Sequence, residues 1–168
     1  MKNYIKENQK LPLYGIGPYM IGGMLAVTLF GIILLGYVFK IGILGLPWTL
    51  IFRIAGVLLI LLGAFIWFMG ALRSGMDENI SENKLKTDGI YAWVRNPMYS
   101  GIWITLIGAT LMWHNAWMLI LPVINWLIMT VVLINTEEKW LIKLYGDEYA
   151  DYKKHVNRCV PFFPKRNK

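Results

Sequence analysis

Four long apolar blocks constrain this chain more than any other feature of its sequence. Three of them reach the length of about 20 residues that a helix needs to cross a bilayer, and the third block along the chain is slightly shorter. They run from about Pro18 to Phe39, Pro47 to Leu72, Pro97 to Trp113 and Ala116 to Asn135. Because backbone polar groups in lipid must be hydrogen-bonded within their own segment, all four blocks are expected to be helices. The predicted fold is an all-α, polytopic membrane bundle of about four transmembrane helices, with a cytoplasmic amphipathic helix near the C-terminus.

The composition agrees with this class. Apolar residues make up 57% of the chain and charged residues 16%, respectively above and below their usual shares in soluble domains. The 168 residues predict one integral membrane domain. Residues 1–72 would hold two spans, and residues 73–168 the helical hairpin and the C-terminal tail. No small-residue cleavage site follows the first apolar block, so it is expected to be a retained span and not a signal peptide.

Basic residues gather on one side of the predicted spans. The N-terminal tail, the link of residues 73–96 and the C-terminal tail are rich in Lys and Arg, whereas the links near Lys40 and His114 carry almost none. The positive-inside rule then places both termini in the cytoplasm of a multi-pass protein of the cell membrane. Membrane topology also explains the net charge of +7 better than nucleic-acid binding does, so no nucleic-acid partner is predicted. The polar link of residues 74–88 is expected to fold over the cytoplasmic mouth. Arg53 is expected to reach the outer interface, and the alternative is that it pairs with a polar group inside the membrane.

The third and fourth blocks are joined by a very short link, residues 113–116, which permits only a tight helical hairpin. The two helices are therefore expected to be antiparallel neighbours. The third helix should begin at Asn96-Pro97, with the Asn side chain as its cap and Pro in the first helical position. Arg95 lies just outside this start and Tyr99 about one turn inside. Taken alone, this stretch also suits a capped helix with an interfacial arginine.

An acidic pair, Glu137 and Glu138, follows the fourth block. The apolar pattern continues past it to Tyr145, so one helix is expected to leave the membrane with the pair at its edge. The macrodipole does not favour a carboxylate in the C-terminal half of a helix. A compensating cation is therefore expected, and Arg95 is predicted at the same end of the hairpin. The alternative is that both glutamates are solvated.

The tail is predicted to form a separate short helix. Gly146 is expected to end the preceding helix and Asp147 to cap the new one. Helical spacing places four residues on one face: Tyr145, Tyr149, Tyr152 and Val156. Lys153, Lys154 and Arg158 are expected to lie largely off it. Such a helix can rest on anionic lipid or fold back so that its tyrosines line a pocket, and the sequence leaves both open.

Several other classes of site find no support. Cys159 is the single cysteine, and His114 and His155 lie far apart, so no disulfide and no metal site are predicted. The glycine-rich motifs of soluble nucleotide-binding folds do not occur.

In their order and spacing, these pieces resemble the isoprenylcysteine carboxyl methyltransferase-like family of membrane methyltransferases. Its pattern reads roughly G-x-Y-x-x-V-R-H-P-x-Y-x-G, then E-E-x-x-L, then F-G-x-x-Y-x-x-Y and a Val/Arg/Pro end. The resemblance covers about Leu85 to Pro164, and the first two blocks match only in being apolar. Tyr145 occupies the position where the family pattern has Phe before Gly. The residues that match the pattern are Gly89, Tyr91, Val94, Arg95, Pro97, Tyr99, Gly101, Glu137, Glu138, Leu141, Gly146, Tyr149, Tyr152, Val156, Arg158 and Pro161.

The resemblance implies a methyltransferase that uses S-adenosyl-L-methionine, needs no metal and acts on a lipophilic small molecule or lipid entering from the bilayer. It also implies that residues 73–168 form the cofactor-binding catalytic core. Arg95 and Glu137 are expected to position the cofactor and act in catalysis. The other expected cofactor-binding residues are Tyr91, Asn96, Tyr99, Glu138, Tyr149 and Arg158. An arginine fork suits the cofactor's carboxylate, glutamates suit its ammonium, sulfonium or ribose hydroxyls, and tyrosine faces suit its sulfonium and adenine.

Two positions depart from the family pattern. Asn96 stands where the family has histidine, and Leu133 where the eukaryotic prenylcysteine enzymes tend to have a basic residue. Both weaken the case for a prenylcysteine carboxylate as substrate. Two alternatives stay open: an enzyme like the membrane sterol reductases, which would use NADPH, and a non-enzymatic accessory protein. The sequence does not decide the substrate, the methylated atom (oxygen, nitrogen or sulfur) or the oligomeric state.

Overall fold

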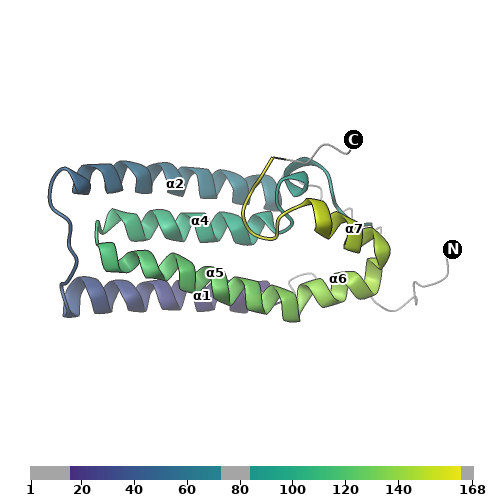
Figure 1. Cartoon of the computed structure of the whole chain (residues 1–168), viewed down its shortest axis with the longest axis horizontal. Helices are drawn as coiled ribbons and strands as arrows, with labels where there is room; N and C mark the ends of the chain where they lie inside the picture. The colour runs from purple at the N-terminus through teal and green to yellow at the C-terminus, as the bar shows by residue number, and fades with distance from the viewer. Residues whose placement is uncertain (1–15, 73–83, 164–168) are drawn as a thin grey trace.

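The protein is a bundle of long helices with two short helices packed at one end (Figure 1). The structure, a computed structural model, describes residues 16–72 and 84–163, so most of the link predicted to cover the mouth lies outside the described residues. Within these ranges there is no β-strand, and the predicted all-α fold is confirmed. The elements are α1 (Gly17–Ile32), the π-helix η1 (Ile33–Val38), α2 (Trp48–Ala71), the 3-10 helix η2 (Gly89–Ala92), α4 (Pro97–Met112), the 3-10 helix η3 (Ala116–Leu119), α5 (Ile120–Asn135), α6 (Glu137–Tyr145) and α7 (Asp147–His155).

The bundle has the dimensions of a membrane domain. Three stretches are long and apolar enough to span a bilayer: Gly17–Val38, Trp48–Ala71 and Ala116–Tyr145. Helix α4 has 16 residues and is therefore about 24 Å long at 1.5 Å per residue. It is surrounded by α1, α2 and α5, so much of its surface faces protein. The predicted hairpin of α4 and α5 is confirmed, because the two helices run antiparallel side by side (Figure 1).

Glycines bring α2 and α4 into close contact. A Cβ added to Gly56 would lie 2.8 Å from the carbonyl oxygen of Gly108, and one added to Gly101 would lie 2.7 Å from that of Gly63. These distances are too short for any larger residue without movement of the backbone. Small residues at such positions let transmembrane helices approach closely. This contact fixes α4, and with it the residues at its N-terminus.

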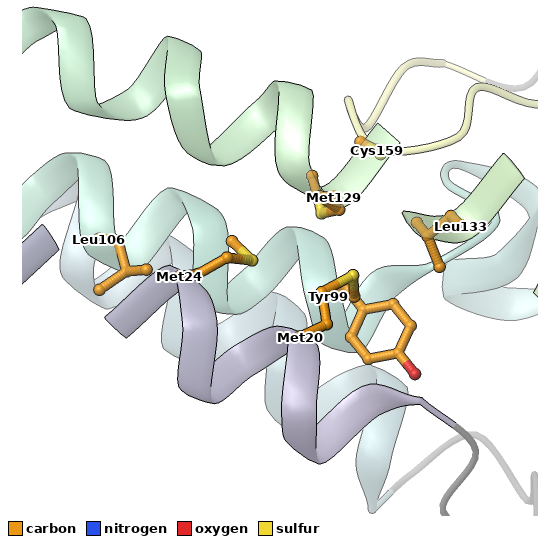
Figure 2. Packing of buried hydrophobic residues seen from close by; sticks show 7 residues of the cluster. All are labelled: Met20, Met24, Tyr99, Leu106, Met129, Leu133 and Cys159. Atoms are coloured by element: carbon orange, nitrogen blue, oxygen red, sulfur yellow. The ribbon is translucent and has the colours of Figure 1, made fainter. Parts of the chain in front are cut away.

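A methionine-rich cluster fills the bundle next to the end that carries α6 and α7. It joins α1, α4, α5 and the segment after α7 through seven buried residues: Met20, Met24, Tyr99, Leu106, Met129, Leu133 and Cys159 (Figure 2). The hydroxyl of Tyr99 points away from Met24 and Leu106, out of the cluster (Figure 2). The cluster therefore provides an apolar floor, with one polar atom at its edge.

The helix predicted to continue through Tyr145 is broken at Thr136. This residue has φ −122° and ψ −86°, and it separates α5 from α6. Its hydroxyl donates to the carbonyl oxygen of Val132 at 2.7 Å, a back-bond that often bends helices. The acidic pair therefore lies at the start of α6. The prediction that it lies in the C-terminal half of one long helix is wrong. At a helix N-terminus the macrodipole stabilises carboxylates.

Candidate functional site

The sequence-predicted site residues all lie at one end of the bundle, where α6 and α7 pack near η2 and the start of α4 (Figure 1). They come from four separate parts of the chain: Tyr91, Arg95, Asn96, Tyr99, Glu137, Glu138, Tyr149 and Arg158. The hairpin of α4 and α5 brings the first four to the level of the acidic pair. Helix α7 and the segment after it supply the last two.

Arg95 lies at the centre of this end. It is 8% exposed, its Nη2 lies 3.1 Å from Oε1 of Glu138, and its Nη1 donates to the hydroxyl of Tyr149 at 3.1 Å. The guanidinium carbon lies 5.8 Å from the centroid of the Tyr149 ring, close enough for a cation–π contact. The expected pairing of Arg95 with the acidic pair is confirmed, through Glu138. Its Nε is buried and has no hydrogen-bond partner among the described residues.

Glu138 is buried and is held by three cations. Besides Arg95, its carboxylate accepts from Arg158 Nε at 2.5 Å and Nη2 at 3.3 Å, and Lys153 Nζ lies 3.0 Å from its Oε2. The hydrogen bond to Glu138 raises the pKa of Arg158. The carboxylate's acceptor positions are thus taken up by the protein itself. The role of Lys153 was missed: it was expected off the tyrosine face, yet it follows Tyr149 by one helical turn, and that spacing puts it on the same side of α7.

Glu137 has different surroundings. Its Oε1 accepts a hydrogen bond from the Tyr99 hydroxyl at 2.6 Å. Within the described part of the chain, its side chain makes no other hydrogen bond or ion pair. A Cβ at Gly17 would lie 2.6 Å from the same hydroxyl, so α1 packs directly against this pair. Of the two glutamates, Glu137 keeps a carboxylate oxygen available for a ligand, while Glu138 is occupied by protein cations.

Asn96 holds the position before α4, and Pro97 is the first residue of the helix, as predicted. The predicted side-chain cap is wrong. The Asn96 amide instead donates through Nδ2 to the carbonyl oxygen of Arg158 at 3.0 Å, because the segment after α7 passes beside it. Residues 156–163, called the C-terminal strap from here on, make two more bonds in this region. Arg95 N donates to Asn157 O at 2.9 Å, and Phe162 N donates to Trp93 O at 3.0 Å.

Helix α7 folds back onto the site. Gly146, with φ 55°, ends α6 as predicted, while Asp147 is the first residue of α7 and not its cap. Tyr149 is 1% exposed, and the Tyr152 hydroxyl donates to the carbonyl oxygen of Tyr91 at 2.6 Å. Of the two interpretations of the tail, folding back against the bundle is confirmed, and the lining of a pocket by its tyrosines stays a prediction. Burial raises the pKa of Tyr149 to about 12, so its hydroxyl is protonated at neutral pH while it accepts from Arg95.

The packing of Cys159, which lies in the strap, was not predicted from the sequence. It is 2% exposed within the methionine-rich cluster, where burial raises the pKa of its thiol to about 11. The thiol is therefore protonated near neutral pH and serves to anchor the strap. In the described ranges, no group of three or more His, Cys, Asp or Glu residues is placed to hold a metal.

Residues 51–148 match the model of the phospholipid methyltransferase family. The matched region begins inside α2 and ends at the start of α7. It therefore extends further toward the N-terminus than the motif resemblance, which began near Leu85. It includes Arg95, Asn96, Tyr99 and the acidic pair.

Several curated proteins are similar to this chain. A protein-S-isoprenylcysteine O-methyltransferase of Schizosaccharomyces pombe is 34% identical over 90 residues, which cover 49% of this chain and 35% of the relative. The Saccharomyces cerevisiae protein of the same name is 30% identical over 122 residues, covering 68% and 51%. A methanethiol S-methyltransferase of Crocosphaera subtropica is 32% identical over 84 residues, covering 50% and 32%. The chain thus spans about a third to a half of the length of these relatives. No solved structure matches it significantly.

Proposed function

Because the chain belongs to the phospholipid methyltransferase family, we propose that it is a membrane-embedded methyltransferase. It would use S-adenosyl-L-methionine and act on a lipophilic small molecule or lipid. The relatives named above are O- and S-methyltransferases, which supports the reaction class. The observation that carries the proposal is the buried Arg95 guanidinium, whose Nε has no hydrogen-bond partner among the described residues. At the same end of the bundle, Glu137 accepts one hydrogen bond from the described part of the chain and keeps a carboxylate oxygen for a ligand.

The side chains at this end suit the polar groups of the cofactor. The Arg95 guanidinium suits the carboxylate of its amino-acid part, because a planar fork can bind a carboxylate through two donors. Glu137 suits its ammonium or ribose hydroxyls as an acceptor. Tyr99 and Tyr149 offer aromatic faces to the sulfonium or adenine. Glu138 is best described as a positioning residue, since it holds Arg95 in place and has no free acceptor position of its own.

The bound cofactor would supply an electrophilic methyl group on its sulfonium. The residues of the chain then have to align the acceptor with that group and exclude water, which can account for much of the rate in a displacement reaction. Buried packing around Arg95 and Tyr149 provides the dry environment. The methionine-rich cluster lies directly beside Tyr99 (Figure 2) and provides apolar surface on which a lipophilic acceptor can rest. Asn96 can donate a hydrogen bond but cannot titrate near neutrality.

We also propose that this end faces the cytoplasm. Eight described basic residues lie at or beyond it: Lys84, Lys86, Arg95, Lys139, Lys143, Lys153, Lys154 and Arg158. Toward the opposite end, the described part of the chain has only two basic residues, Lys40 and Arg53, and both are exposed. This asymmetry favours the side with more Lys and Arg as the cytoplasmic one.

The proposal is tested by methyl transfer in lipid nanodiscs. Full-length protein, S-adenosylmethionine with a tritiated methyl group and a membrane lipid extract are incubated, and label is counted in the organic phase. We expect wild-type protein to transfer label and Arg95→Lys to lose most of this activity, since lysine keeps the charge beside Glu138 but lacks Nε. Lys143→Gln, an exposed control on α6, should behave as wild type. Equal activity of the Arg95→Lys and wild-type proteins would contradict the assignment of Arg95.

A further inference from the structure

A cationic pocket adjoins the candidate site and shares Arg95 and Arg158 with it. It lies between the end of α7, the C-terminal strap and Trp93. Its volume is about 280 Å³, and its basic lining includes Lys153, Lys154 and Arg158. Its aromatic lining includes Trp93, Phe162 and Phe163. A pocket that combines basic and aromatic side chains fits an anion with an apolar neighbour.

The charge of this lining is positive after its ion pairs are counted. Four lining cations, namely Arg95, Lys153, Lys154 and Arg158, face two paired carboxylates: Glu138 and Asp151, whose Oδ1 lies 2.7 Å from Lys154 Nζ. Four positive charges minus two negative charges leave +2. Among the described residues that line the pocket there is no Asp or Glu. The pocket therefore attracts an anion.

The aromatic residues of the pocket are turned outward. Phe162 and Phe163 are 65% and 74% exposed, and Trp93 is 38% exposed. The ring centroids of Trp93 and Phe163 lie 5.0 Å apart, so the two rings together form one apolar edge of the pocket. Of these three, Trp93 is of a type that is enriched at the membrane–water interface.

The level of the pocket along the bundle also places it at the membrane–water interface. Trp93 lies four residues before Pro97, the first residue of α4. A Cβ at Gly70, near the end of α2, would lie 2.9 Å from the Pro97 side chain, so the pocket is level with the ends of two membrane helices. Phospholipid headgroups occupy this level of a bilayer.

We propose that this pocket binds the phosphate headgroup of an anionic phospholipid from the surrounding leaflet. Lys153, Lys154 and Arg158 hold the phosphate, and the Trp93–Phe163 edge packs against the glycerol and upper acyl chain. Free phosphate fits the cations but leaves the aromatic edge without a partner. Binding at this pocket does not depend on methyl transfer, so it stands or falls separately from the proposed enzyme activity.

Native mass spectrometry of the full-length protein in detergent tests this proposal. Phosphatidylglycerol and phosphatidylcholine are titrated separately, and bound lipid is counted. We expect one phosphatidylglycerol to be retained with at least about tenfold preference over phosphatidylcholine, since basic residues near an anionic surface contribute about 1 kcal/mol each. Lys154→Gln should weaken this binding about fivefold, which is the same contribution expressed as an affinity. Lys143→Gln, which removes an exposed lysine outside the pocket, should leave it unchanged.

Three further results decide between occupants. Phe163→Ala should weaken phosphatidylglycerol binding, and 10-fold excess inorganic phosphate should not displace the lipid. The lipid and S-adenosylhomocysteine should be found bound to the same molecule. The proposal is overturned if both lipids bind equally, if Lys143→Gln acts like Lys154→Gln, or if inorganic phosphate displaces the lipid. It is also overturned if S-adenosylhomocysteine displaces the lipid one for one, which would make the pocket part of the cofactor site and leave the proposed enzyme activity intact.

Discussion

Neutralising Glu138 should mainly lower the stability of the protein, whereas neutralising Glu137 should mainly lower its affinity for the cofactor product. The Glu138 side chain is 3% exposed, and its partner Arg95 is 5% exposed, so this ion pair is desolvated on both sides. Arg158 and Lys153 are 20% and 39% exposed, and water can partly compensate them. Glu138→Gln keeps the shape of the side chain but leaves three cations facing one another without a counter-charge.

The expected cost of Glu138→Gln is set by the buried arginine. Removing one partner of a buried ion pair costs about 3–5 kcal/mol, and the partly exposed cations place the value near the lower end, at about 3 kcal/mol. Glu137→Gln keeps an oxygen that can accept from Tyr99, so its cost should be that of a weakened hydrogen bond, about 1 kcal/mol or less. Glu137→Gln should instead lower affinity for S-adenosylhomocysteine.

Both variants can be measured in one experiment. The proteins are unfolded in mixed micelles with increasing SDS, and helicity is followed by circular dichroism; binding is measured on the same samples before unfolding. The reasoning is refuted if the two variants lose equal stability, or if Glu137→Gln is the less stable one.

Three further predictions follow from packing and burial. Tyr149→Phe removes the acceptor of a buried guanidinium donor and should cost about 1.5–3 kcal/mol of unfolding free energy. Gly63→Val should destabilise the α2–α4 contact by about 1–3 kcal/mol through overpacking, because its Cβ would lie 2.5 Å from the Gly101 carbonyl oxygen; both are measured by SDS unfolding. The thiol of Cys159 should resist maleimide at pH 8 in the folded protein, because burial raises its pKa from 9.0 to about 11. The protonated thiol is favoured in the fold, so stability should fall as pH rises from about 9 toward 11.

Each of these predictions has a matched control. Tyr145→Phe removes a hydroxyl that makes no hydrogen bond in the described part of the chain and should leave stability nearly unchanged. Gly22→Val adds a side chain where no atom lies within 4 Å of the new Cβ. It should lower the unfolding free energy by much less than Gly63→Val does. Cys159 should react with maleimide after unfolding in SDS. Equal effects in either variant pair, or equal labelling of folded and unfolded protein, would show the corresponding argument to be wrong.

The spans were predictable because each is a local property of the sequence. With η1 counted as part of the first helix and η3 as part of the fourth, hydropathy and Asn96-Pro97 marked the helix bounds to within about two residues. The short link near His114 identified the hairpin. The break at Thr136 was not predicted, because the apolar pattern continues on both sides of it. The hydrogen bond from the Thr136 hydroxyl to the Val132 carbonyl oxygen does not change that pattern. The glycine contact of α2 with α4 also joins two segments that no local pattern connects.

The candidate site was predictable in its membership and less so in its contacts. Motif order identified Arg95 and the acidic pair, and the hairpin brought them together. The local pattern could not show that the Asn96 amide would bond the carbonyl of Arg158, which lies 62 positions along the chain, instead of capping its own helix. Nor could it divide the acidic pair into a saturated Glu138 and an available Glu137, because that depends on where α7 and the strap fold back.

Calorimetric titration with S-adenosylhomocysteine is the most direct test of the proposed cofactor site. Full-length protein in lipid nanodiscs should bind one molecule saturably. Arg95→Lys, with its fold checked by circular dichroism, should bind about 10–100-fold more weakly, as expected for the loss of a charged hydrogen bond of about 1.5–3 kcal/mol. NADPH should give no saturable heat. A folded protein that binds NADPH, or that shows no saturable binding of S-adenosylhomocysteine, would contradict the account.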